Sequence, residues 1–236
     1  MARLRERGGV RRFLLPLLGT AAAVTALVAP LSSLQAQAPA AAQPAAGGTP
    51  KAVPIRVENY LLLPEPKVVR SSISVTLAKA RLTVFTPVKL DPSTSRLVPY
   101  TEAEFSKLGI SADSFQKKAA EAADRRLATL QPELIKDDAG KVIYAVYRGE
   151  DHLFPCLLTA PSLGKIFEKV FGKEVWVVTP DRNSLYVFPA GADALQEFAD
   201  DLQDRFDSST FPASEEIFSL KVESGEMTVV GNFTNR

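Results

Sequence analysis

The two residue types most often used for nucleophilic and acid–base chemistry occur close together in this chain. Cysteine and histidine are present once each among the 236 residues, as Cys156 and His152. A thiol with an imidazole base is the pair that cysteine hydrolases use, because the base removes the thiol proton. Such partners normally converge from distant parts of a chain, however. The surrounding "LFPCLLTA" is also apolar, which favours a buried, unreactive Cys156.

A second candidate site lies in "WVVTPDRNSLYVF", where Asp181 and Arg182 stand between two apolar runs. The planar guanidinium of Arg182 is suited to hold a carboxylate or a phosphate. The segment is equally suited to a hairpin, since Pro180 can end the first strand without losing a needed N–H group. Turn chemistry is the favoured interpretation, and the acid–base pair is the first place to test for a binding site.

The sequence contains none of the common nucleotide or hydrolase motifs. It has no Walker-type phosphate loop, no G-x-G-x-x-G and no G-x-S-x-G. A single histidine excludes a His-pair metal motif, and the consecutive residues of "GEDH" (149–152) favour a solvated loop over an ion site. We therefore expect no metal and no cofactor, and we assign no catalytic residue. The candidate binding residues are Asp181, Arg182, His152 and Cys156.

Residues 1–38 have the pattern of an export signal. Five arginines up to Arg12 precede the apolar "FLLPLLGTAAAVTALVAPL" and the small-residue stretch "SSLQAQAPA". Pro16 and the many alanines make this run weak as a membrane span, although an uncleaved anchor is the alternative. Arg11-Arg12 partly resembles a twin-arginine signal, but Val10 replaces the usual Ser or Thr, which favours ordinary unfolded export. We expect an exported protein, periplasmic or extracellular, with no stable membrane span after cleavage.

Residues 39–54 are rich in Ala, Pro and Gln and predict a flexible linker. The whole chain has a formal net charge of +1, and five arginines with one glutamate lie in the signal. The remainder is therefore mildly acidic, which gives no electrostatic basis for binding nucleic acid.

Residues 55–236 predict a single α+β domain in which hairpins alternate with helices around a mostly antiparallel sheet. Thr101 with Glu104 forms a capping box that begins a short helix, and Ser111 begins an amphipathic helix that runs to about Leu130. Residues 71–90 end in a strand, whereas their first half is also compatible with a helix. Further helices are expected in the later part of 157–171 and over 193–206.

Hairpins are predicted around residues 138–140, at the polar centre of 176–188, and at 224–225 between the last two strands. Five aromatic residues fall on the central strands, where core packing is favoured over an aromatic groove. They are Tyr144, Tyr147, Trp176, Tyr186 and Phe188.

Three stretches between residues 81 and 233 resemble a bacterial family catalogued as domain of unknown function 1444. They are "RLTVFTPVKLDPSTSRLVPYTEAEFSKLGISADSFQKKAAEAADRRL", "VIYAVYRGEDHLFPCLLTAPSLGKIFEKVFGKEVWVVTPDRNSLYVF" and "FPASEEIFSL". The resemblance implies a single α+β domain and no established reaction. The chain departs from the family in its export signal and in the order Asp181-Arg182-Asn183, where the family has arginine before aspartate.

Two functions remain open on the sequence. The favoured hypothesis is a non-catalytic binding or interaction module of the cell envelope, for a protein or small ligand that the sequence does not identify. The alternative is a hydrolase of unrecognised type that uses Cys156 with His152, or carboxylates near Asp181.

Overall fold

The computed structural model describes residues 60–234 apart from 78, 92, 95, 151–153 and 192. The predicted signal, the linker and the start of the predicted domain at 55–59 lie outside the described residues. All of the described residues belong to one compact unit, Ala52–Arg236.

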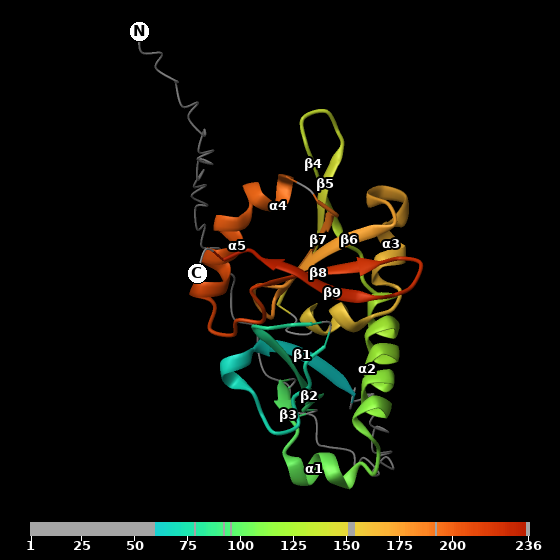
Figure 1. Cartoon of the computed structure of the whole chain (residues 1–236), viewed down its shortest axis with the longest axis vertical. Helices are drawn as coiled ribbons and strands as arrows, with labels where there is room; N and C mark the ends of the chain where they lie inside the picture. The colour runs from blue at the N-terminus through green and yellow to red at the C-terminus, as the bar shows by residue number, and fades with distance from the viewer. Residues whose placement is uncertain are drawn as a thin grey trace, which may run out of the picture. The chain divides into compact units, whose positions relative to one another are not determined.

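Within the described residues the strands form two antiparallel sheets (Figure 1). The small sheet has the order β1-β2-β3 and contains β1 (Leu61–Pro66), β2 (Thr83–Leu90) and β3 (Leu97–Pro99). The large sheet has the order β4-β5-β7-β6-β8-β9. Its strands are β4 (Glu133–Lys136), β5 (Val142–Arg148), β6 (Glu174–Val178), β7 (Ser184–Pro189), β8 (Glu216–Lys221) and β9 (Met227–Asn232). The predicted α+β class is confirmed.

The helices follow the predicted positions closely. They are α1 (Glu102–Lys107), α2 (Ala112–Leu127), α3 (Leu163–Phe171), α4 (Asp193–Glu197) and α5 (Ala199–Ser208), with 3-10 turns η1 (Lys67–Val69) and η2 (Phe154–Thr159). The capping box of Thr101 and Glu104 is confirmed. The hydrogen bond from Lys89, followed by those from Thr101, lowers the pKa of Glu104 to about 2. Ser111 caps α2 by accepting the N–H of Ser114.

Two expectations about helices need correction. The first half of 71–90 is not helical in its described residues, because Val75 pairs with Phe85 of β2 in an isolated bridge. The helix expected over 193–206 is interrupted at Phe198, which separates α4 from α5. The ring of Phe198 packs edge-on against Tyr144 of β5, with centroids 4.9 Å apart. Phe198 is partly buried and packs against the core cluster on this side of the large sheet at the break between the two helices.

Helices cover both faces of the large sheet. One face packs against α2, η2 and α3 through residues such as Tyr147, Val177 and Phe167. The other face packs against α4 and α5 through residues such as Phe188 and Leu202. The five aromatic residues of the central strands are buried or packed against these clusters, so core packing is confirmed for them.

Glu216, the first residue of β8, joins the two sheets. Its Oε1 accepts hydrogen bonds from the N–H groups of Arg81 at 2.7 Å and Leu82 at 3.0 Å, and its Oε2 accepts one from Thr83 at 3.1 Å. The carboxylate is buried, and the three N–H groups lie just before and at the start of β2. A carboxylate that satisfies three adjacent backbone donors is strongly held, since charge-assisted hydrogen bonds are the strong ones.

Two further contacts reinforce this junction. The hydroxyl oxygens of Thr83 and Ser214 lie 2.6 Å apart, and Ser214 Oγ accepts the N–H of Glu216. Arg182 Nη2, from the turn between β6 and β7, lies 2.7 Å from Oε1 of Glu65 on β1. The side chains of Glu65 and Arg182 are only 8% and 19% exposed.

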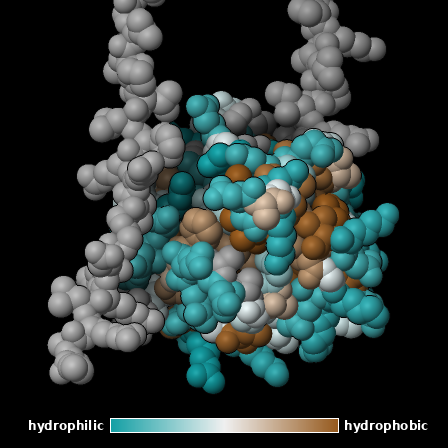
Figure 2. Space-filling view, turned by 90° about the horizontal axis from the view of Figure 1, so that it is seen from above, coloured by the Kyte–Doolittle hydropathy of each residue, from teal (hydrophilic) through white to brown (hydrophobic). Residues whose placement is uncertain are grey.

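Hydrophobic side chains of the described residues reach the face seen from above. Figure 2 shows hydrophobic side chains that reach this face in small areas between hydrophilic ones. Scattered apolar exposure of this kind is usual in folded proteins and indicates no site. Among the described residues, no helix is both long enough and apolar enough to cross a bilayer.

Replacing Glu216 with alanine is expected to lower the free energy of unfolding by roughly 3–5 kcal/mol, because the part-buried N–H groups of Arg81 and Leu82 and the buried one of Thr83 lose their acceptor. Urea denaturation followed by circular dichroism measures the loss. Glu226→Ala is the matched control, since its ion pair with Lys221 is half exposed, and we expect a change of about 0.5 kcal/mol or less. Equal small losses in both variants would contradict the junction role of Glu216.

Candidate functional site

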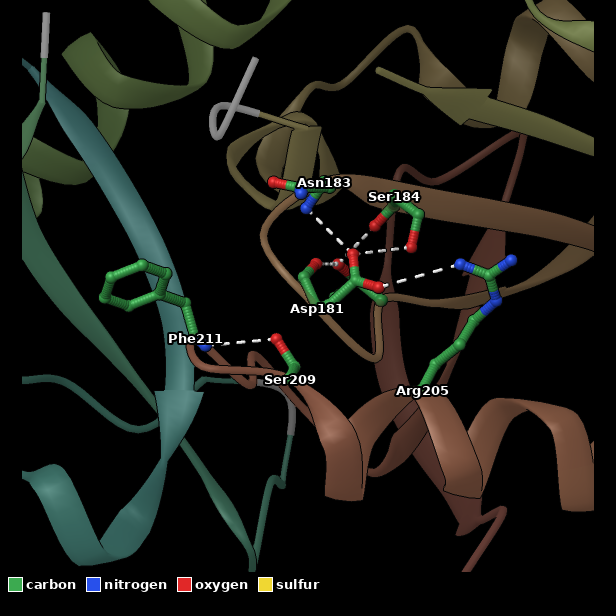
Figure 3. A network of polar contacts seen from close by, with 7 residues as sticks. Asp181, Asn183, Ser184, Arg205, Ser209 and Phe211 are labelled. Atoms are coloured by element: carbon green, nitrogen blue, oxygen red, sulfur yellow. Dashed lines mark hydrogen bonds and ion pairs between the residues drawn. The ribbon is translucent and has the colours of Figure 1, made fainter. Parts of the chain in front are cut away.

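The polar centre of the predicted hairpin is a turn held by its own aspartate (Figure 3). Asp181 Oδ1 accepts hydrogen bonds from Asn183 N and Ser184 Oγ, both at 2.8 Å. An aspartate that bonds the backbone two residues onward stabilises a turn. Its Oδ2 lies 4.0 Å from Nη1 of Arg205 on α5, and the Asp181 side chain is only 13% exposed. The carboxylate of Asp181 therefore stabilises the turn.

The same turn is fixed by backbone pairing that the sequence does not reveal. Pro180 and Thr179 accept hydrogen bonds from the N–H groups of Ala213 and Ser214, and Arg182 N donates to the carbonyl of Phe211. The segment that leads into β8 thus lies alongside the turn. This pairing directs Arg182 toward the small sheet, where its guanidinium meets Glu65 and lies over the Phe211 ring at 5.0 Å.

Asp181 and Arg182 are consequently neighbours with separate partners. A surface hollow of about 450 Å³ lies beside them and is lined also by Arg205 and Phe211. The guanidinium of Arg182 is already paired with a carboxylate, and Arg205 faces Asp181 across the hollow. Because negative and positive side chains line the same hollow, it would attract an anion only weakly. The geometry therefore favours the structural interpretation of the pair.

Cys156 lies away from this turn. It is 1% exposed and packs in a cluster with Leu61, Leu63, Val88 and Ala122, between the small sheet and α2. A thiol in such surroundings is not accessible to a substrate and is expected to be inert. His152 lies outside the described residues, so the structure places only three of the four predicted site residues.

Burial shifts the pKa of the tyrosines on β5 and β7 upward, so that their hydroxyls stay protonated near neutral pH. Burial raises the pKa of Tyr147 to about 12, and burial is also the main cause of the raised pKa of Tyr144 and Tyr186. The hydroxyl of Tyr147 is buried without a hydrogen-bond partner among the described residues.

A different hollow lies where the two sheets meet, and we call it the junction hollow. Its volume is about 520 Å³, and its lining comes from the segment before β2, from Glu216 and from the end of β9. The lining residues are Lys79, Arg81, Leu82, Glu216, Val229, Val230, Gly231 and Asn232. The Glu216 carboxylate fixes the backbone of 81–83 and so determines the shape of this hollow.

The 3-10 turn η1 adjoins the junction hollow, because Lys67 N donates to the carbonyl of Leu82 at 2.7 Å. Residues Lys67, Val68, Val69 and Arg70 are all exposed, and Val68 is 93% exposed. We call the junction hollow together with these four residues the basic face.

The four cations of the basic face have no counter-charge among the described residues. Lys67, Arg70, Lys79 and Arg81 form no ion pair with any described acidic residue. Glu216 is the acidic residue of the hollow, and its oxygens are occupied by backbone N–H groups. The sequence analysis did not identify this surface. One pattern in the sequence does indicate it, because no acidic residue occurs between Glu65 and Asp91.

The backbone of Lys79 is strained. Its φ of 62° is in the left-handed region, where among the described residues it is the one non-glycine. For a residue with a side chain, this backbone conformation costs a free energy on the order of 1–2 kcal/mol. Strain of this kind often accompanies a functional position, and here it holds an exposed lysine at the wall of the junction hollow.

Metal binding is not indicated where the structure describes the chain, because no cluster of three His, Cys, Asp or Glu side chains is present there. Comparisons with protein-family models, with curated proteins and with solved structures find no match to this chain.

Cys156 is expected to react with a thiol reagent at least ~100-fold faster in denaturant than in the folded protein, because access requires unfolding. A colour-forming disulfide reagent measures the rate. Val170→Cys is the control, since it adds a thiol at a position that is 45% exposed on α3. Rapid labelling of Cys156 in the folded wild-type protein would restore the nucleophile hypothesis.

Replacing Arg182 with methionine is expected to destabilise the fold by roughly 3 kcal/mol, since Glu65 is left buried without its counter-charge. The double variant Glu65→Leu/Arg182→Met should recover part of this loss. Lys173→Met, from an ion pair whose side chains are both more than 70% exposed, should change stability by about 0.5 kcal/mol or less. An Arg182→Met protein of unchanged stability would leave Arg182 available for a ligand.

Proposed function

We propose that this protein is an exported, non-catalytic interaction module of the cell envelope. Its basic face is proposed to bind an acidic, partly apolar, extended segment of a partner protein. The observation that carries the proposal is the group of four cations without ion-pair partners among the described residues. Lys79 and Arg81 line the junction hollow beside exposed apolar side chains, and Lys67 and Arg70 lie on or next to the adjoining η1.

Charge supports an acidic partner. Lysine and arginine side chains held near one another repel, and a partner carboxylate relieves that repulsion while it gains charge-assisted hydrogen bonds. The chain after residue 38 carries a small net negative charge, so the basic face is a local positive region on a protein of opposite net charge. Such a contrast favours one docking orientation for an acidic segment.

Apolar exposure supports a partner that is not acidic throughout. Val68, Val69, Leu82 and Val230 are four of the most exposed large apolar side chains of the described residues, and all belong to the basic face. Burying them against a partner removes apolar surface from water, at roughly 25 cal/mol per Å². A segment that alternates acidic and apolar residues meets both requirements, because successive side chains of an extended chain point to opposite sides.

The recessed shape favours a peptide over a lipid surface. The junction hollow lies between the 79–82 segment and the end of β9, so it can receive individual side chains. A bilayer surface contacts protruding groups, whereas two of the exposed apolar side chains of this face, Leu82 and Val230, line the hollow. The β9 edge is also irregular, since the register with β8 shifts between Ile217 and Phe218. A bulge discourages simple addition of another strand, which leaves side-chain contacts as the mode of binding.

Export is supported by the sequence alone. The arginine-rich start, the apolar run and the small residues of 1–38 support a periplasmic or extracellular location, with residues 39–54 as a tether. The resemblance of residues 81–233 to the family catalogued as domain of unknown function 1444 likewise stays a proposal. It concerns ancestry and fold, and it adds no reaction.

The test uses a fluorescent ten-residue peptide that alternates glutamate with leucine or valine, and a second peptide in which lysine replaces each glutamate. Fluorescence anisotropy at low salt should show binding of the acidic peptide only, weakened as salt is added. The double variant Lys79→Gly/Arg81→Gln is expected to bind about tenfold more weakly. Glycine relieves the strain at residue 79, so stability should stay within about 1 kcal/mol of wild type.

Lys141→Gln is the control, because this lysine lies in the exposed β4–β5 turn and should leave affinity unchanged. Vesicles of anionic lipid serve as the competing probe. Tight vesicle binding without peptide binding would overturn the choice of a peptide partner. Equal affinity of wild type and the double variant would overturn the assignment to the basic face.

A further inference from the structure

A third hollow, which we call the α2 hollow, lies on another part of the unit. Its volume is about 300 Å³, and its walls come from α2, η2, the first turn of α3 and the β8–β9 hairpin. Its lining includes the buried side chains of Leu62, Leu158 and Leu220 together with the partly buried Met227. We propose that the α2 hollow binds a small molecule with an apolar body and one carboxylate.

The apolar part of the ligand is inferred from the walls. Leucine and methionine side chains from three separate segments converge here, so an apolar body can leave water on several sides at once. The first turn of α3 closes one wall, since a Cβ at Gly164 would already be in ordinary van der Waals contact, 3.5 Å from Cγ2 of Val222. The volume is at the lower end of the range for ligand pockets, about 300–1,000 Å³, which indicates a small ligand.

The carboxylate is inferred from the rim. Lys117 and Gln116 lie side by side on α2 at the hollow, and neither side chain has a hydrogen-bond or ion-pair partner among the described residues. The other lysine of the rim, Lys221, is already paired with Glu226 at 3.0 Å. One cation and one amide donor are therefore available on the α2 wall of an apolar hollow, which fits a single anionic head group.

This site is independent of the basic face. The α2 hollow shares no lining residue with the junction hollow. A variant of the basic face that loses peptide binding is therefore expected to keep ligand binding at the α2 hollow. The two sites lie toward opposite ends of β9, with Met227 at one and residues 229–232 at the other.

Straight-chain carboxylates and their matched alcohols test the proposal. Isothermal titration calorimetry with hexanoate, octanoate and decanoate should show affinity that rises about fourfold per methylene until the hollow is filled. Octanol, which has the same chain and no charge, should bind at least fivefold more weakly than octanoate. Amide chemical shifts should change in residues 116–120 and 220–227 on octanoate addition.

Two variants separate the contributions of the head group and the chain. Lys117→Gln is expected to weaken octanoate binding about fivefold and to leave octanol unchanged, whereas Arg125→Gln, exposed on the same helix, should change neither. Ala120→Phe, which fills the hollow from the partly exposed face of α2, should abolish both. Equal affinity for octanoate and octanol in wild type, unchanged octanoate affinity in Lys117→Gln, or shifts at other residues would overturn the proposal.

Discussion

The buried carboxylate of Glu216 is the constraint on which the arrangement of this protein depends. A charged group loses much solvation on burial, so it is tolerated only where hydrogen bonds replace the lost water. Three consecutive N–H groups of residues 81–83 provide that replacement, and they lie just before and at the start of β2 in the other sheet. The small sheet is therefore fixed to the large one by a contact that cannot slide, because a shift of one residue would leave buried polar groups unpaired. Thr83 with Ser214 and Glu65 with Arg182 add to the same junction.

The same constraint shapes the surface that we assign to binding. By holding the backbone of 81–83, Glu216 places Arg81 and Leu82 opposite the end of β9 and leaves Lys79 at the wall of the junction hollow. Asp181 and Arg182 of the β6–β7 turn also stabilise the fold, each through its own partner. Asp181 closes the turn, and Arg182 reaches across to Glu65. Both residues contribute to the fold, whereas the four cations of the basic face form no ion pair with any described acidic residue.

Local chemistry explains what the sequence could predict. The capping box at Thr101 and Glu104, the amphipathic pattern of α2 and the turns of three hairpins depend on residues close together in the chain, and each is confirmed. The interruption at Phe198 depends on its packing against Tyr144, more than fifty positions away. The division into two sheets and the partners of Arg182 and Glu216 likewise depend on long-range pairing. Residue type marked Asp181 and Arg182 as candidates, but only tertiary contacts reveal that each already has a structural partner.

Amide hydrogen exchange of the protein with and without a saturating acidic–apolar peptide tests the central claim most directly. The method reports where a partner lies without any substitution, and residues 79–83 and 229–232 provide two separate segments that must respond together. The account predicts slowed exchange in both segments and in η1, with the β6–β7 turn at 179–183 unchanged. Slowed exchange at that turn alone, or no change in the two segments under saturating peptide, would contradict it.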